Sequence, residues 1–158
     1  GMKRFLVIIV ILLSLVLTAC SGSTASTVEA QPSTVEKSGS QQPSSLERKD
    51  TQGAVVVTVT PVNLDNPGET LDFNVSMETH SVELDMDLTS LATLSTDTGV
   101  SVQSSTWNGP KGGHHIAGTL SFPTQKDGSS LVEGAKVLTL KIQNVDAPER
   151  VFSWEIQK

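Results

Sequence analysis

The chain has 158 residues, a formal net charge of −6 and a single cysteine. Aromatic residues make up only 4% of it, and 17 acidic residues outnumber 11 basic ones. This acidic balance excludes nucleic acid and anionic lipid headgroups as natural partners, because both are bound through basic patches. One cysteine also excludes an intrachain disulfide, so a hydrophobic core has to stabilise the fold.

The first nineteen positions have the organisation of a bacterial export signal. Gly1 precedes the natural initiator methionine and is excluded as an addition to it. Two basic residues at positions 3 and 4 are followed by an apolar run over 5–16. A membrane span needs about 20 apolar residues, whereas the core of a secretory signal needs about 7–15. Residues 1–19 are therefore predicted to be a signal peptide.

The apolar run ends in Leu17-Thr18-Ala19-Cys20, which resembles the lipobox of bacterial lipoproteins at all four positions. The resemblance implies cleavage before Cys20, a diacylglycerol thioether on its sulfur, and an N-acyl chain. Several acyl chains anchor a protein stably where one would be marginal. The alternative is a plain signal peptide or an uncleaved anchor with an incidental cysteine. Ser21 implies the outer membrane in a host with two membranes, and a host with one would carry the protein on its outer face.

Residues 21–52 are dominated by Ser, Thr, Gln, Gly and Pro and contain no aromatic residue. Such a stretch cannot bury enough apolar surface to offset the entropy of ordering it. Together with the lipidated Cys20 it forms a predicted disordered linker over 20–52. A flexible linker of this length averages about 30 Å end to end and reaches about 105–115 Å when fully extended.

Residues 53–158 are predicted to form one all-β domain, because short alternating runs rich in Val and Thr are separated by Gly, Pro, Asn and Asp. Strands are predicted at 55–60, 71–77, 82–88, 100–107, 116–122, 137–142 and 151–156. A short helical turn is predicted to bridge two strands around Leu91 and Leu94. About seven strands at this spacing indicate an immunoglobulin-like β-sandwich, and a small closed β-barrel is the alternative.

Glu83, Asp85 and Asp87 alternate with apolar residues and are predicted to form an acidic stripe on one strand face. Residues 53–158 carry 13 acidic and 6 basic residues, a net charge of −7. Carboxylates could hold a hard cation such as calcium. A strand, however, spaces alternate side chains about 6.5–7 Å apart. A solvated outer face that keeps the domain soluble is the favoured interpretation.

The stretch WNGPKGGHHIAG over 107–118 contains two of the three histidines. If the alternation of the following strand runs backwards, His114 faces the core and His115 faces solvent. The two histidines then share a metal only if the glycines at 112 and 113 bend the backbone. His80 follows the second predicted strand, with Met77 and Met86 on either side of it.

Three histidines and two methionines in an exported domain resemble the ligand types of periplasmic copper carriers, some of which are β-sandwiches. The resemblance implies a copper site built from imidazole and thioether groups, which suit copper. The spacing does not match a known ligand motif, so His80, His114 and His115 are candidate ligands only. The alternative places the histidines in loop hydrogen bonding and the methionines in the core as gap-fillers.

Trp107 is a candidate ligand-binding residue, because an indole at a loop rim can stack on a sugar or peptide. The alternative is that it closes one end of the sandwich over the glycine turn. The neighbouring glycines supply positive φ angles and do not form a phosphate loop, since no Gly-Lys-Ser/Thr follows. The stretch 79–120 also resembles exported bacterial proteins of unknown function, which implies a single domain but no activity.

No nucleophile elbow and no zinc-protease helix motif occurs in the sequence. We therefore expect no enzyme, but a membrane-tethered lipoprotein whose domain binds a protein or ligand of the cell envelope. The alternative function is metal handling, with copper or zinc held by His80, His114 and His115. No other cofactor is expected, and the oligomeric state does not follow from the sequence.

Overall fold

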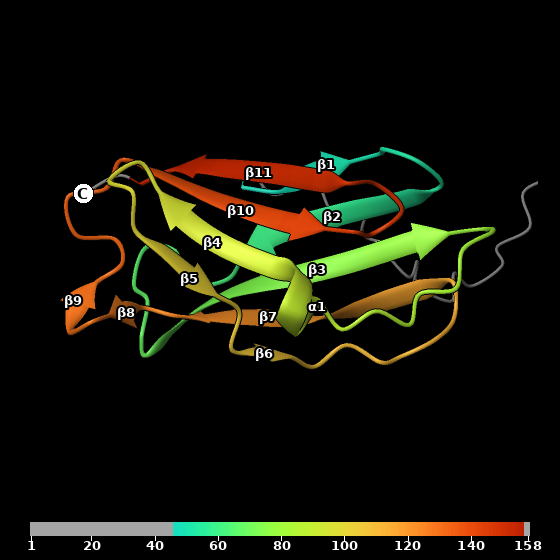
Figure 1. The fold of residues 1–158 in the computed structure, drawn as a ribbon, viewed down its shortest axis with the longest axis horizontal. Coiled ribbons are helices and arrows are strands. Elements are labelled where there is room, and N and C mark those ends of the chain that lie inside the picture. The colour runs from blue at the N-terminus through green and yellow to red at the C-terminus, as the bar shows by residue number, and fades with distance from the viewer. Residues whose placement is uncertain (1–45, 157–158) are drawn as a thin grey trace, which may run out of the picture. The chain divides into compact units, whose positions relative to one another are not determined.

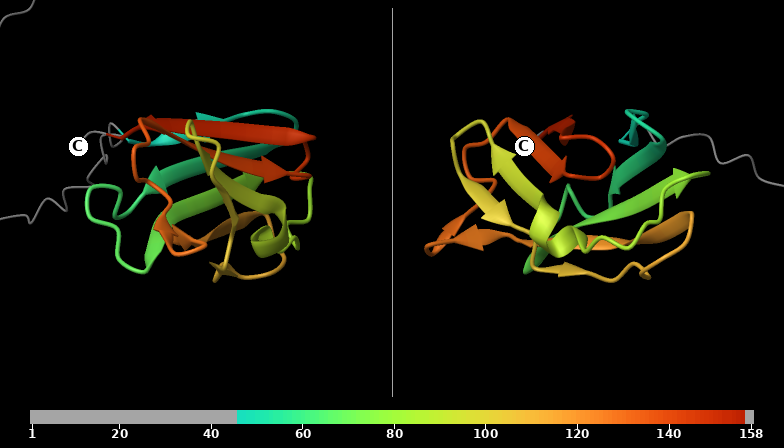
Figure 2. Two further views of the ribbon diagram at one scale, coloured as in Figure 1. Left: turned by 60° about the vertical axis from the view of Figure 1, so that its left-hand side comes forward. Right: turned by 45° about the vertical axis from the view of Figure 1, so that its right-hand side comes forward.

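The computed structural model describes residues 46–156, so the predicted signal peptide, Cys20 and most of the predicted linker lie outside the described residues. Two antiparallel sheets face each other (Figures 1 and 2). The five-stranded sheet has the order β1 (Arg48–Asp50), β2 (Val55–Pro61), β3 (Thr70–Thr79), β7 (His115–Pro123), β6 (Thr106–Trp107). The four-stranded sheet has the order β11 (Glu149–Glu155), β10 (Val137–Gln143), β4 (Ala92–Thr96), β5 (Ser101–Gln103). A short helix, α1 (Leu88–Leu91), precedes β4, and a small hairpin pairs β8 (Gln125–Lys126) with β9 (Ser129–Ser130).

This strand order is that of the immunoglobulin fold. Strands β2, β3, β7 and β6 occupy the places of A, B, E and D in one sheet, and β11, β10, β4 and β5 occupy those of G, F, C and C′ in the other. The predicted immunoglobulin-like β-sandwich is therefore confirmed. The alternative fold, a small closed β-barrel, is wrong, since no sheet within residues 46–156 closes into a barrel.

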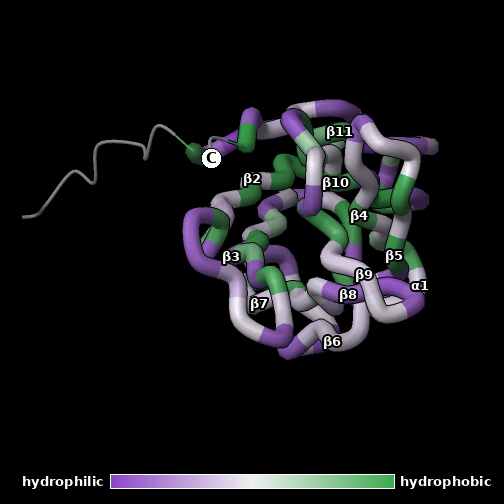
Figure 3. The backbone as a smooth tube through the Cα atoms, turned by 90° about the vertical axis from the view of Figure 1, so that its left-hand side faces the viewer, coloured by the Kyte–Doolittle hydropathy of each residue, from purple (hydrophilic) through white to green (hydrophobic). Residues whose placement is uncertain are grey.

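The core lies between the sheets because the strands alternate as the sequence predicts. In β2, Val55, Val57 and Val59 are fully buried, while the residues between them are partly exposed. The inward side chains of β3, β7, β10 and β11 complete one cluster around Phe73, whose ring packs edge-to-face on Phe122. Figure 3 shows apolar residues concentrated along the strands and polar residues concentrated in the loops.

Two predicted strands are wrong. Residues 82–87 form no strand, because the hydroxyl of Thr79 accepts hydrogen bonds from two following backbone N–H groups and turns the chain, after which Asp87 begins α1. The predicted strand over 100–107 is two short strands in different sheets. Between them, Ser104 donates its N–H to Ala92 in one sheet and its hydroxyl to Ser121 in the other, so the chain changes sheets there.

The sandwich also begins earlier than Gly53. Strand β1 pairs with β2 over Arg48–Asp50, a segment that the sequence places in the linker. It belongs to the domain because Leu46 packs against the core and its carbonyl accepts a 2.6 Å hydrogen bond from the indole of Trp154. A strand of three residues with one apolar contact is too short to give a sequence pattern.

Within residues 46–156, no helix is long and apolar enough to cross a membrane.

Candidate functional site

Three loops meet at one end of the sandwich, which we call the loop end. They are residues 80–87 after β3, residues 108–114 before β7, and residues 144–148 between β10 and β11. In the immunoglobulin fold these are the B–C, D–E and F–G loops, and variable domains use the B–C and F–G loops of this end for binding. The loop end lies where β3 finishes and β7 starts, at the right of Figure 1.

Backbone hydrogen bonds join the first two loops. The Leu84 N–H donates a hydrogen bond to the Gly113 carbonyl at 3.1 Å, and the Gly112 N–H donates one to the Leu84 carbonyl at 2.8 Å. The carboxylate of Glu83 accepts a 2.7 Å bond from the Gly113 N–H. Gly112 and Gly113 have φ angles of +89° and +102°, which only glycine adopts readily. The glycines therefore bend the chain so that the two loops fit together.

The bend overturns the predicted orientation of His114. Strand β7 begins only at His115, and the positive φ angles before it rotate His114 out of the strand alternation, so its side chain is exposed instead of facing the core. Its backbone carbonyl accepts a 2.9 Å hydrogen bond from the Thr79 N–H. His115 is exposed, as predicted, and so is His80. All three histidines thus lie on the surface of the loop end.

His80 and His115 contact each other. Their ring centroids are 6.3 Å apart, and the ring planes make an angle of 79°. The register of β3 and β7 explains the contact: Glu78 is directly opposite His115, and His80 comes two residues later on the same face of the chain. Within residues 46–156, no group of three or more His, Cys, Asp or Glu side chains is placed to hold a metal ion.

The two methionines are not part of this surface. Met77 is fully buried in the core, and Met86 is partly buried against it. They pack as apolar side chains, which is the second of the two roles that the sequence left open.

The predicted acidic stripe is wrong because its residues are not on a strand. Glu83 binds the glycine turn, while Asp87 caps α1 by accepting a 2.9 Å hydrogen bond from the Thr89 N–H. This hydrogen bond lowers the pKa of the Asp87 carboxyl below its ordinary value. Glu83 and Asp87 therefore each stabilise the backbone near them, and Asp85, which lies between them in the sequence, is exposed.

Trp107 packs against the core and is half-buried. Its ring lies directly over Gly109, where any Cβ atom would overlap it, and Gly109 in turn lies against Gly118 of β7. The indole N–H is buried without a hydrogen-bond partner. The structure therefore places this ring against the core and over Gly109.

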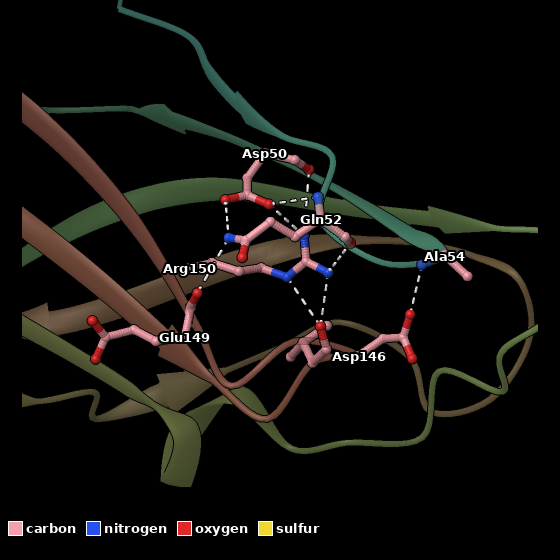
Figure 4. Close-up of polar contacts among 7 residues, drawn as sticks. Asp50, Gln52, Ala54, Asp146, Glu149 and Arg150 are labelled. Atoms are coloured by element: carbon pink, nitrogen blue, oxygen red, sulfur yellow. Dashed lines mark hydrogen bonds and ion pairs between the residues drawn. The ribbon is translucent and has the colours of Figure 1, made fainter.

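A buried arginine at the loop end has no counterpart among the residues singled out from the sequence. Arg150 is fully buried and binds three residues from two segments (Figure 4). It donates to the Val145 carbonyl at 2.8 and 3.0 Å, to the Gln52 carbonyl at 2.7 Å and to the Asp50 carboxylate at 2.7 Å. One signal was present in the sequence, since Arg150 has the inward parity of Phe152 and Trp154 in β11.

Asp50 is the counter-ion of this arginine. Partial burial raises the pKa of the Asp50 carboxyl, but the hydrogen bonds from Gln52 and the charge of Arg150 outweigh it and hold the pKa below its ordinary value. Nearby, the Asp146 carboxylate accepts a 2.6 Å bond from the Ala54 N–H. The cluster thereby fixes the 144–148 loop against the turn that joins β1 to β2.

Two shallow grooves lie away from the loop end. One, of about 680 Å³, is lined by Leu46, Leu64 and Trp154 at the opposite end of the domain. The other, of about 510 Å³, crosses the outer face of the five-stranded sheet over Thr58 and Asn74. Neither groove is lined by any of the three histidines.

No protein-family model matches this chain, and no curated protein matches it. Among solved structures, it is similar to the crystal structure of a DUF4426 family protein from Pseudomonas aeruginosa PAO1. The similarity covers 70% of this chain and 99% of the other chain, with 13% sequence identity and a TM-score of 0.40. A match this distant carries no information about activity.

Proposed function

We propose that the protein is a membrane-tethered lipoprotein of the cell envelope whose sandwich is a non-catalytic binding module. The tether part of the proposal rests on the resemblance of Leu17–Cys20 to a lipobox and on the composition of the residues that follow it. The non-catalytic part rests on the absence from the sequence of the local catalytic motifs considered above.

The position of the loop end carries the proposal. The chain enters the described domain at Leu46, beside the end of β2, because β1 runs antiparallel to β2 and pairs Arg48 with Val59. The loop end lies at the start of β2, where Val55 pairs with Thr79. Seven residues of strand separate the two ends by about 20 Å. A linker attached at Leu46 would therefore leave the loop end free to face a partner.

The loop end is also braced, as a binding surface needs to be. The glycine turn and Glu83 join the 80–87 and 108–114 loops, and Arg150 fixes the 144–148 loop. Rigid loops lose little conformational entropy when a partner binds. The exposed histidines are thus presented on fixed backbone.

Strand addition at the edges of the four-stranded sheet is a less favoured mode of binding. The outer edge of β11 is covered where Arg48 donates to the Ser153 carbonyl at 3.1 Å and Gln52 donates to the Glu149 carbonyl at 3.2 Å. At the other side, Lys126 donates to the Ser101 carbonyl of β5 at 2.7 Å. Short edges with charged side chains across them resist pairing with another strand.

Fatty-acid labelling tests the tether. Labelled palmitate is expected to enter the wild-type protein in cells and to be absent from Cys20→Ala, because the thioether needs the cysteine sulfur. Equal labelling of the two proteins would contradict lipidation at Cys20.

Site-directed photocrosslinking tests the binding surface. A photoreactive amino acid at His114 samples the loop end, and the matched control at Gln125 samples the opposite end of β7. Discrete adducts are expected from position 114 in cells and not from position 125, and they are expected to weaken in the Cys20→Ala background. Equal adducts from both positions, or none from either, would contradict the proposal.

Metal handling is the second candidate, with copper or zinc as the cargo and His80, His114 and His115 as candidate ligands. The contact between the His80 and His115 rings favours it, because residues far apart in the sequence bring two imidazoles together on the surface.

A further inference from the structure

The separation of the His80 and His115 rings can be compared with that of two imidazoles sharing one metal ion. A metal–imidazole bond is about 2.0 Å, and a ring nitrogen lies about 1.2 Å from its own centroid, so each centroid lies about 3.2 Å from the metal. Two such rings have centroids about 6.4 Å apart when the N–metal–N angle is 180°, and about 5.2 Å apart at the tetrahedral angle. The observed separation is 6.3 Å.

The ring separation is therefore close to that of a linear arrangement. The 79° angle between the planes is compatible with it, because rotation of either ring about a linear N–metal–N axis leaves both bonds unchanged. Both side chains are exposed, so small rotations about their χ angles bring one nitrogen of each ring to the midpoint.

The number of ligands distinguishes the metals. Zinc is bound by protein sites in a tetrahedral geometry that needs three or four ligands. Within residues 46–156 no group of three or more His, Cys, Asp or Glu side chains could hold a metal ion, and the methionines pack in or against the core, with Met77 fully and Met86 partly buried. Cu(I) has a filled d shell, binds imidazole well and accepts two neutral nitrogen ligands in a line.

We propose that His80 and His115 hold one Cu(I) ion between them as a linear two-coordinate site. This proposal rests on the metal-handling candidate above and narrows it to one ion and two of the three histidines. His114 has no part in it, because the ring contact joins only His80 and His115.

Anaerobic titration with the Cu(I)–bicinchoninate complex tests the site on the full-length chain. All variants carry Cys20→Ala, so that a free thiol does not take the copper. One equivalent of Cu(I) is expected in this background and in His114→Gln, the matched control. His80→Gln and His115→Gln are each expected to lose more than about tenfold in affinity, since even outer-shell changes typically cost 10–100-fold.

X-ray absorption at the copper edge provides a second readout, and a two-coordinate nitrogen environment is expected. Three or four ligands, or an equal loss of affinity in His114→Gln and His115→Gln, would overturn the linear site. Retention of one zinc equivalent without Cu(I) would overturn the Cu(I) assignment and leave the metal-handling candidate standing. Retention of neither metal would overturn both.

Discussion

Removal of the Arg150 side chain is expected to destabilise the domain strongly. The guanidinium is fully buried and forms an ion pair with Asp50, whose side chain is 15% exposed. Arg150→Ala leaves this carboxylate without its counter-ion and the Val145 and Gln52 carbonyls without their donor. Breaking a buried, hydrogen-bonded ion pair from one side costs about 3–5 kcal/mol. A domain of this size has a total stability of about 5–15 kcal/mol, so the loss is a large fraction of it.

Urea denaturation followed by tryptophan fluorescence measures the effect, because Trp154 is buried four residues away in the same strand. With an m value of about 1.5 kcal/mol per molar urea, the midpoint is expected to fall by about 2–3 M. The protein used is a truncated form that starts at Gly39, seven residues before the described domain begins at Leu46. If Arg150→Ala does not fold, Arg150→Lys keeps the charge, loses the planar fork, and is expected to show an intermediate loss.

The matched control is Lys141→Ala. Lys141 of β10 forms an ion pair at 3.3 Å with Glu149 of β11, which is next to Arg150 in the chain, but the two side chains are 45% and 38% exposed. An exposed pair contributes only about 0.2–1 kcal/mol, so the midpoint is expected to move by less than about 0.7 M. If Arg150→Ala moves the midpoint no further than Lys141→Ala does, the reasoning from burial is refuted.

Three further outcomes are expected. Gly118→Ala would place a Cβ atom 2.6 Å from the backbone of the adjacent loop and is expected to lower the melting temperature, whereas Gly68→Ala has open space and is expected to leave it nearly unchanged. Two backbone N–H groups at the start of β10 hold the pKa of Asp97 below 3.8. The stability that Asp97 contributes is therefore present above pH 3.8 and is lost as the pH falls through the lowered pKa. When urea midpoints are measured against pH, Asp97→Asn is expected to lose less stability in acid than the wild type. A chain that starts at Gly53 lacks Asp50 and Gln52, which bind Arg150, and is expected to unfold at a lower urea concentration than one that starts at Gly39. Equal midpoints would show that β1 and the turn after it are dispensable.

The fold was predictable because its longer strands carry a complete alternation. β2, β3, β7 and β10 each bury every second side chain, and the hydrophobic effect acts on that pattern without any information about partners. The shorter elements were not predictable. The sequence pattern places β1 in the linker, predicts a helical turn around Leu91 and Leu94 in place of β4, and predicts β5 and β6 as one strand. Two to five residues contain too few apolar positions to show a period.

The sequence singled out the three histidines and the glycines of the loop end, but it did not indicate how the loops bend. The glycines at 112 and 113 were visible as a turn, but the sense of the bend depends on φ angles that the loop adopts only against Leu84 and Glu83. Strand alternation therefore placed His114 in the core, whereas it is exposed. Arg150 was overlooked because charged residues are rarely buried without a partner. Its inward position in β11 makes sense only once Asp50 is known to lie beside it.

The contact between His80 and His115 depends on strand register, which neither residue reveals. Strands β3 and β7 are neighbours because the chain builds β4 and β5 in the opposite sheet before it returns. Their register is set by the buried faces: a slip of one residue would turn Ile116 and Leu120 out of the core. The core thus fixes where the two histidines meet, yet both rings are exposed and contribute no core packing. The stability of the fold therefore gives no reason for two imidazoles at these positions. Substitution of His80 or His115 is expected to lower the affinity for metal and to leave the stability of the domain unchanged, which separates a metal site from a structural contact.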